Sequence, residues 1–216
     1  MTTIGIIGSG HVGSNLARAA INHGYNVVLS NSQGPGSLAE LISSLGPTAR
    51  AVSPAEAAAA ADFAIVAIPV TTIDQLPADP LAGKVVLATI NYFPQRDGHI
   101  TAIDDGTTTA PGLLQAHLPK SSVVRAFSMI DAAEMSGDGH PKGDPKRRAL
   151  ALAGDDEAAK QLVVRLYDEF GFDAVDLGPL AESWRVDPGQ PGFVTRQNLT
   201  ELTANAANAK RPASDA

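Results

Sequence analysis

The chain has 216 residues, the length of one large domain or of one domain with a small appendage. Hydrophobic residues make up 44% and charged residues 18%. The 20 glycines and 15 prolines are about 16% of the chain, below the roughly 25–30% of low-complexity sequences, which excludes collagen-like and wholly disordered chains. A formal net charge of −7 repels phosphate backbones and anionic lipids, so we expect neither nucleic acid nor a membrane as a partner.

The sequence contains no cysteine, which excludes disulfides, thiolate metal ligands and a cysteine nucleophile. Its first ten residues, MTTIGIIGSG, carry no basic segment, and their apolar run ends at Gly8. No other segment approaches the roughly 18 consecutive apolar residues of a membrane span. We therefore expect a soluble, cytoplasmic protein.

Short apolar, β-branched runs alternate with helical patterns, which is typical of β-α-β units around a parallel sheet buried on both faces. The strands predicted from these runs are residues 4–7, 27–29, 63–68, 84–89, 122–127, 149–153 and 173–176. The predicted fold class is therefore α/β, a Rossmann-type doubly wound and mainly parallel sheet, followed by a short C-terminal helical segment.

Capping signals mark the starts of the predicted helices. Ser37 with Glu40 and Ser53 with Glu56 form capping-box patterns. An alanine-rich run follows the second box and is expected to pack closely on the sheet. Asp155 is expected to cap a later amphipathic helix.

The chain divides into two predicted parts. Residues 1–178 carry the β-α rhythm and form a Rossmann-type dinucleotide-binding domain, in which residues 135–148 are expected to be a surface loop. Residues 179–216 pass irregularly through three prolines and end in a polar helix at about 195–209. This second part is expected to contribute to a dimer or to the substrate site.

Six residues follow the first predicted strand and open the next predicted helix: Gly8, Ser9, Gly10, His11, Val12 and Gly13. They match G-x-G-x-x-G in the strand–turn–helix context that a dinucleotide-binding loop requires. Gly8 permits the tight turn, Gly10 lets a pyrophosphate approach the backbone, and Gly13 lets the helix pack on the strand. The alternative is a glycine-rich turn with no ligand. We predict that these six residues bind a dinucleotide.

The end of the second predicted strand distinguishes the two nicotinamide dinucleotides. An NAD-binding protein places an acidic residue there to bind the ribose 2′-hydroxyl, whereas this chain has Ser30, Asn31, Ser32 and Gln33. Without that carboxylate nothing repels a 2′-phosphate, and small or amide side chains can donate hydrogen bonds to it. We therefore predict NADP(H) as the cofactor, bound by Asn31, Ser32 and Gln33, the alternative being a plain polar turn.

Residues at the carboxyl ends of other strands are candidates to flank the ribose and the nicotinamide, because ligands of open α/β sheets bind outside those ends. The candidates are Ile68, Pro69, Val70, Asn91, Ser128 and Met129. Each of them is equally compatible with an ordinary strand terminus.

Acid–base and metal chemistry have little support in the sequence, and no catalytic residue is assigned. None of the five histidines pairs with His or Glu at the H-E-x-x-H spacing, and no G-x-S-x-G elbow occurs. A dinucleotide fold without an evident proton relay favours direct hydride transfer, in which the cofactors carry the chemistry and the protein aligns them.

Several segments resemble the NADPH-dependent reductases of the deazaflavin coenzyme F-420, also called F-420:NADP oxidoreductases. The likeness covers roughly residues 3–187 and is carried by IGIIGSGHVGSNLARA, VVLSNSQGPGSL, KVVLATINYFPQRDGHI, VVRAFSMI and GFDAVDLGPLAESWR. The resemblance implies a homodimer that moves a hydride between F-420, as co-substrate, and C4 of the nicotinamide. The family commonly carries arginine where this chain has Gln33.

Two other functions remain open from the sequence. One is an NAD(P)H-dependent reductase of a flavin or of a small imine or carbonyl, and the other is a non-catalytic NADPH-binding sensor. The basic cluster of Lys142, Lys146, Arg147 and Arg148 is either a solvated loop or a binding surface for the acidic tail of a deazaflavin.

Overall fold

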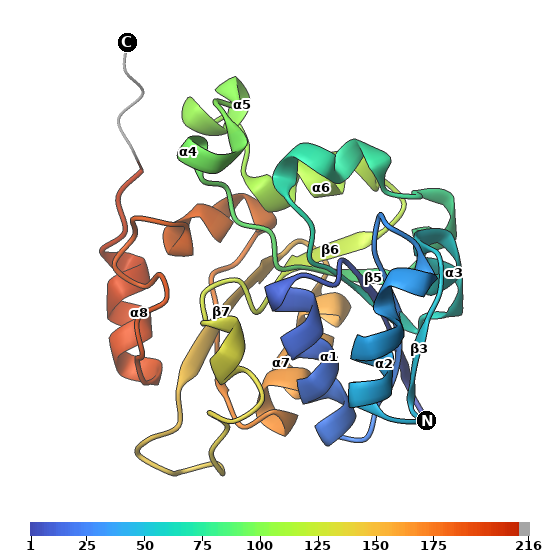
Figure 1. The fold of residues 1–216 in the computed structure, drawn as a ribbon. Coiled ribbons are helices and arrows are strands. Elements are labelled where there is room, and N and C mark those ends of the chain that lie inside the picture. The colour runs from blue at the N-terminus through green and yellow to red at the C-terminus, as the bar shows by residue number, and fades with distance from the viewer. Residues whose placement is uncertain (212–216) are drawn as a thin grey trace.

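The computed structural model describes residues 1–211, which form a central eight-stranded sheet with the strand order β3-β2-β1-β4-β5-β6-β7-β8 (Figure 1). Neighbouring strands run parallel except β6 and β7, which are antiparallel. The strands are β1 (Thr3–Ile7), β2 (Asn26–Ser30), β3 (Ala49–Ala51), β4 (Phe63–Val66), β5 (Val85–Ala88), β6 (Ser122–Arg125), β7 (Ala149–Gly154) and β8 (Asp173–Asp176). This is the predicted α/β, Rossmann-type sheet.

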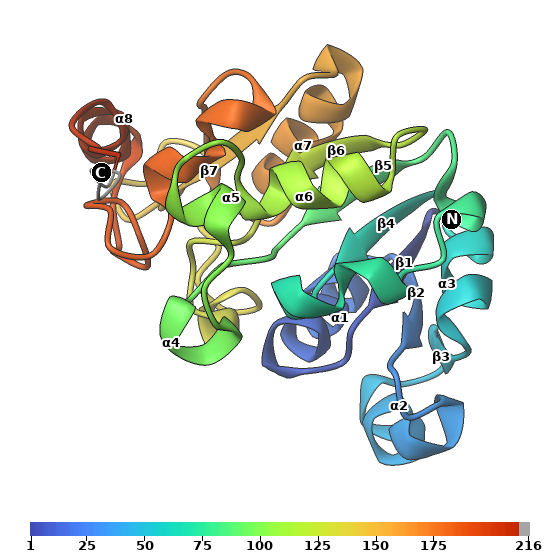
Figure 2. The ribbon, with the colours of Figure 1, turned by 90° about the horizontal axis from the view of Figure 1, so that it is seen from above.

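Helices cover both faces of the sheet. Helices α1 (His11–Asn22), α2 (Ala39–Leu45) and α7 (Glu157–Glu169) pack in one apolar core, and α3 (Pro54–Ala60) and α6 (Ala110–His117) pack in the other. Figure 2 shows β1 between α1 and α3. Helices α4 (Pro94–Asp97) and α5 (Thr101–Asp104) project from the sheet at the top of Figure 1, and α8 (Leu199–Ala207) packs beside β7 and β8.

Five short 3-10 helices connect these elements: η1 (Pro35–Leu38), η2 (Val70–Gln75), η3 (Asp79–Leu81), η4 (Ala132–Glu134) and η5 (Leu180–Val186). No helix among residues 1–211 is both long enough and apolar enough to span a membrane.

The alternation of side chains along β1 explains how helices pack on both faces of the sheet. Ile4 and Ile6 are buried in the core that α1 shares, whereas Gly5 faces α3. A Cβ atom at Gly5 would lie 2.5 Å from the carbonyl oxygen of Ala57, so α3 sits directly on the strand. The alanine-rich helix thus packs closely on the sheet, as predicted, because both surfaces lack large side chains.

The seven predicted strands all form, with ends within two residues of those expected. Strand β3 was not predicted, because three residues reading Ala-Arg-Ala carry no apolar run. The capping box at Ser53 is confirmed, but the one at Ser37 is wrong, since α2 begins at Ala39 without a side-chain cap. Asp156, not Asp155, caps α7.

The C-terminal part also differs in detail from its prediction. Helix α8 spans Leu199–Ala207, shorter than the expected 195–209, and begins at a capping box of Asn198 and Glu201. The predicted second part, 179–216, runs past the described residues, and its last five positions, 212–216, lie outside them.

The basic cluster differs from both of its predicted roles, because two of its members are buried. Arg147 is 4% exposed and pairs with Asp168 at 2.6 Å and Asp173 at 2.8 Å. Arg148 is 1% exposed and pairs with Glu134 at 2.5 Å. These guanidiniums fasten the loop of residues 135–148 to the body of the protein and are not free to bind an anion.

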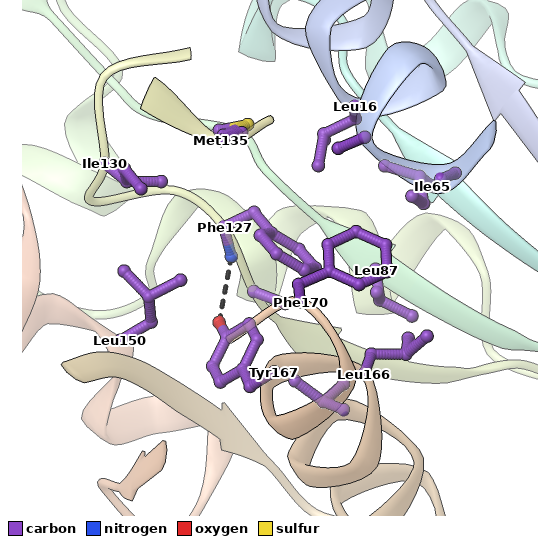
Figure 3. Packing of buried hydrophobic residues seen from close by; sticks show 14 of the residues in the cluster. Leu16, Ile65, Leu87, Phe127, Ile130, Met135, Leu150, Leu166, Tyr167 and Phe170 are labelled. Atoms are coloured by element: carbon purple, nitrogen blue, oxygen red, sulfur yellow. Dashed lines mark hydrogen bonds between the residues drawn. The ribbon is translucent and has the colours of Figure 1, made fainter. Parts of the chain in front are cut away.

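A buried hydrogen-bonded tyrosine organises the core around the end of β6 (Figure 3). Phe127 has a φ of 53°, a left-handed conformation that costs a bulky residue about 1–3 kcal/mol. The hydroxyl of Tyr167 accepts a hydrogen bond from the Phe127 N–H and donates one to the carbonyl oxygen of Ala151, each at 2.9 Å. Complete burial of Tyr167 raises its pKa, so the neutral hydroxyl bridges the two strands.

Replacement of Tyr167 by Phe removes this bridge and leaves a buried N–H and a buried carbonyl without a partner. We expect the free energy of unfolding to fall by about 1–3 kcal/mol, as for other buried unsatisfied groups. Urea denaturation measures this loss. Tyr92→Phe is a matched control, because the Tyr92 hydroxyl is near solvent and water can replace it; an equal loss in both variants would contradict the prediction.

Candidate functional site

The candidate site lies where the chain reverses its direction of travel across the sheet. From β1 the chain proceeds outward to β2 and β3, then returns to place β4 on the other side of β1. The carboxyl ends of β1 and β4 therefore border the crevice that binds ligands in doubly wound folds. The predicted glycine loop follows β1, and residues 67–70 follow β4.

Two glycines of the loop are required by the packing itself. Gly8 has a φ of 108°, and a Cβ there would lie 2.2 Å from the carbonyl oxygen of Ala67. A Cβ at Gly13 would lie 1.8 Å from the carbonyl oxygen of Gly8. The loop is thus folded tightly between the ends of β1 and β4 and the start of α1.

Gly10 differs from these two because a Cβ there would meet nothing within 4 Å. It is exposed and forms the N-cap of α1, which has no side-chain cap and no acidic residue in its first turn. The N–H groups of a first helical turn have no partner within the helix, and the helix dipole favours an anion there. This open, uncapped N-terminus fits the pyrophosphate of a dinucleotide.

The other loop residues have different surroundings. Ser9 and Val12 are half-buried, and Val12 packs against the apolar core. The side chain of His11 is 69% exposed, and its Nε2 lies 3.8 Å from a carboxylate oxygen of Asp131, just before η4. Sequence reasoning missed Asp131, because nothing in the pattern shows that residue 131 returns to the glycine loop.

The loop after β2 is shaped by Asn31. Its amide nitrogen donates to the Ser37 hydroxyl at 2.9 Å, and its amide oxygen accepts from the Gln33 N–H at 3.1 Å. Asn31 therefore supports the turn, whereas the side chains of Ser32 and Gln33 are exposed. Ser37 lies within η1, and Leu38 occupies the N-cap position of α2, so Ser37 bonds to Asn31 and does not cap α2.

The residues after β4 divide between surface and core. Pro69 is exposed, and Ile68 is half-buried, with its Cγ2 3.1 Å from the Cβ position of Gly8. Val70 is 4% exposed and belongs to the core beneath α3 and α6. Ile68 and Pro69 are thus available at the crevice, and Val70 is not.

A buried arginine that the sequence reasoning missed joins the ends of β5 and β6. Arg125 is 0% exposed; its Nε donates to the Ser128 hydroxyl at 2.6 Å, and a terminal nitrogen donates to the Asn91 amide oxygen at 2.9 Å. Asn91 in turn donates to the Ser128 carbonyl oxygen at 2.7 Å. Asn91 and Ser128, predicted separately, are therefore parts of one network.

The same guanidinium also fixes the C-terminal part of the chain. Arg125 donates to the carbonyl oxygens of Ser183 at 2.9 Å and Val186 at 3.1 Å, and it forms an ion pair with Asp187. The sequence did hold a signal for this network. Arginine is the last residue of the apolar strand SVVR, and an arginine in that position needs hydrogen-bond partners inside the protein.

Met129 does not face the crevice. Its side chain is 0% exposed within the core, and its sulfur accepts a hydrogen bond from the Ala151 N–H at 3.3 Å. The rings of Phe93 and Phe193 meet edge-on with their centroids 6.1 Å apart, which joins the residue before α4 to the C-terminal part. Among residues 1–211 no cluster of three His, Asp or Glu side chains suited to a metal occurs.

Comparison with known proteins gives a consistent result. Residues 3–92 match the family model described as NADP oxidoreductase, coenzyme F420-dependent. The hypothetical protein SMa0349 of Sinorhizobium meliloti is 30% identical, with a TM-score of 0.76 over 92% of this chain and 96% of that protein. A proposed F420-dependent NADP reductase from Arthrobacter is 24% identical, with a TM-score of 0.72 over 85% of this chain and 87% of that one.

A longer curated relative matches as well. The metalloreductase STEAP3 of Rattus norvegicus is 29% identical over 85% of this chain. The chain spans less than two fifths of the length of the curated relatives it matches, 35% in the case of STEAP3. The glycine loop, the strand order and the family match agree, and the chain belongs to the coenzyme F420-dependent NADP oxidoreductase family.

Proposed function

We propose that the protein transfers a hydride between NADP(H) and the deazaflavin coenzyme F-420. The observation that carries this proposal is the open space above Gly10, at an uncapped helix N-terminus beside the chain reversal, within the segment that matches the family. When bound, the nicotinamide supplies or accepts the hydride at C4.

The protein's own residues bind and orient in this proposal. The N–H groups of Ser9 to Val12 hold the pyrophosphate, and Ser32 and Gln33 contact the 2′-phosphate. Ile68 and Pro69 border the ribose. The half-buried Asn91 borders the nicotinamide after β5, and Ser128, which is 4% exposed, holds Asn91 in place from within the core. Arg125 positions these last two, because it bonds to both side chains.

An assay of the purified chain tests the proposal. The protein is incubated with NADPH and, in parallel, with F-420, FMN and simple imines, while the nicotinamide absorbance is followed. Oxidation of NADPH in the presence of F-420, but not in the presence of FMN or an imine, supports the proposal. Turnover confined to FMN or an imine would favour the flavin or imine reductase, and NADPH binding without turnover would favour a sensor.

The resemblance also implies a homodimer, which we propose as the solution state. Val194 and Leu199 are 43% and 46% exposed, large apolar side chains that a partner subunit would cover. Sedimentation equilibrium tests this expectation. A monomer at micromolar concentration with an intact fold would contradict it.

Replacement of Gly10 by Val is expected to abolish dinucleotide binding and leave the fold intact. The new side chain meets no protein atom within 4 Å of its Cβ, so it fills the space that the pyrophosphate needs. Calorimetry with NADPH and thermal denaturation measure the two effects. Gly137→Val is the matched control, since Gly137 is equally open but distant in the loop 135–148; undiminished affinity in the Gly10 variant would show that the loop is not the site.

Replacement of Gln33 by Arg is expected to sharpen the preference for NADPH over NADH. Neutral donors contribute about 1 kcal/mol each, whereas a charge-assisted arginine contact contributes roughly 1.5–3 kcal/mol, which is about tenfold or more. The measurement is the ratio of the two dissociation constants in parent and variant. An unchanged ratio would mean that Gln33, although exposed, points away from the ribose.

A further inference from the structure

The side-chain amide of Asn91 is held at its two ends by partners of opposite kind. Its oxygen Oδ1 accepts a hydrogen bond from a terminal nitrogen of Arg125 at 2.9 Å, and its nitrogen Nδ2 donates to the carbonyl oxygen of Ser128 at 2.7 Å. A guanidinium can only donate and a carbonyl oxygen can only accept, so a reversed amide would lose both bonds. The chemistry of the two neighbours therefore fixes the orientation of Asn91.

The guanidinium of Arg125 has no hydrogen left for a ligand. It makes five hydrogen bonds, one from Nε and two from each terminal nitrogen, with acceptors on Ser128, Asn91, Ser183, Val186 and Asp187. An arginine side chain has five N–H groups, so all of them are used. Because Arg125 is also 0% exposed, it can act on a ligand only through the groups that it holds.

Asn91 keeps one N–H group to offer. A primary amide nitrogen carries two hydrogens, and within residues 1–211 Nδ2 bonds to a single acceptor, the Ser128 carbonyl oxygen. Asn91 is half-buried, whereas its partner Arg125 is fully enclosed. The bond from the buried cation to Oδ1 polarises the amide, which makes the remaining N–H a stronger donor. The amide thus offers a donor, while its oxygen faces the buried arginine.

The topology places this donor on the nicotinamide side of the crevice. Strand β5 lies beside β4, whose carboxyl end borders the glycine loop, and Asn91 follows β5. A dinucleotide binds across the chain reversal, so when its adenosine ribose lies at the end of β2, its other half extends toward β4 and β5. The hydrogen-bond acceptor that a nicotinamide ring carries is the oxygen of its carboxamide group.

We propose that Asn91 donates a hydrogen bond to the carboxamide oxygen of the nicotinamide, and that Arg125 holds Asn91 in this donor orientation. The inference rests on the proposed function, since it assumes that the dinucleotide lies along the carboxyl edge of the sheet. Asn91 is then the residue that recognises the nicotinamide end of the cofactor, and Arg125 is a positioning residue. A pyridine ring that carries a carbonyl oxygen fits this site, whether or not it also carries an amide N–H.

Calorimetry on the full chain, the Asn91→Ala variant and the Gln95→Ala control tests the proposal. The ligands are NADP⁺, its 3-acetylpyridine analogue, its thionicotinamide analogue and 2′-phospho-ADP-ribose. The acetyl analogue keeps the carbonyl oxygen without the amide N–H, the thio analogue replaces that oxygen by sulfur, a weak acceptor, and the last ligand has no pyridine ring. Gln95 is exposed on α4, so the control removes an amide group near Asn91 in sequence.

Loss of one hydrogen bond weakens binding about three- to tenfold. We expect this loss in Asn91→Ala for NADP⁺ and, equally, for the acetyl analogue. For the thio analogue the loss is less than about twofold, because sulfur accepts weakly in the parent as well. The affinity for 2′-phospho-ADP-ribose is the same in all three proteins, and Gln95→Ala binds every ligand as the parent does.

Two results of this series would overturn the inference. If Asn91→Ala weakened NADP⁺ but not the acetyl analogue, the group contacted would be the carboxamide N–H, and Asn91 would act as an acceptor. If it weakened 2′-phospho-ADP-ribose as much as NADP⁺, the contact would lie outside the nicotinamide.

Proton NMR of the Asn91 side-chain amide tests its orientation. The two Nδ2 proton resonances are assigned by their absence in Asn91→Ala. NADP⁺ is expected to move one of them downfield, as a new hydrogen bond does, and 2′-phospho-ADP-ribose is expected to move neither. Absence of the downfield shift in the parent overturns the inference, because an amide with its oxygen toward the ligand has no proton there.

The Arg125→Lys variant tests the positioning role. Lysine keeps the charge but lacks the planar fork of donors, so it does not hold both Asn91 and Ser128. We expect the NADP⁺-induced downfield shift to be lost while the affinity for 2′-phospho-ADP-ribose is retained. A shift that persists, or an equal loss of affinity for both ligands, would exclude Arg125 as a positioning residue. Where this variant does not fold, the amide shift in the parent decides.

The outcomes also distinguish this inference from the function on which it rests. A parent that binds neither NADP⁺ nor 2′-phospho-ADP-ribose overturns both. A parent that binds both ligands, with an affinity for NADP⁺ that is unchanged in Asn91→Ala, overturns the inference and leaves the proposed function standing.

Discussion

One buried guanidinium holds the carboxyl edge of the sheet together. Arg125 ends β6 with its side chain at 0% exposure, and every direction of its planar fork finds an acceptor. Removing a partner from such a buried ionic cluster costs about 3–5 kcal/mol, because the remaining charge stays buried. Two of its acceptors lie at the ends of neighbouring strands and the rest in the C-terminal part, so the position of η5 depends on this one residue.

A second constraint acts in the glycine loop after β1, where Gly8 and Gly13 have no room for a side chain. The carbonyl oxygen of Ala67 occupies the place where Gly8 would carry a Cβ, and that of Gly8 occupies the corresponding place at Gly13. Backbone packed this closely has few alternative conformations, so the helix N-terminus points in a fixed direction without any capping side chain. The loop is therefore organised before a ligand arrives, which lowers the entropy cost of binding.

Local patterns predicted most of the fold, because parallel strands buried on both faces are continuous apolar runs and the glycine loop has a fixed spacing. Features that depend on contacts distant in sequence were not predictable in this way. Arg147 looks like part of a basic loop until Asp168 and Asp173 are brought beside it, and Met129 looks like a strand end until β7 covers it. Asp131 and Arg125 acquire their roles through partners far along the chain.

The ion pairs of the buried arginines also determine where positive charge is available in the protein. The chain has 16 Lys and Arg residues, and three of the arginines, Arg125, Arg147 and Arg148, are buried in ion pairs that fasten loops and the C-terminal part to the sheet. These cations serve the fold and are not free for a phosphate. In the proposed site the attraction for an anionic ligand comes from backbone N–H groups and the dipole of α1, contributions that are fixed in geometry and independent of pH.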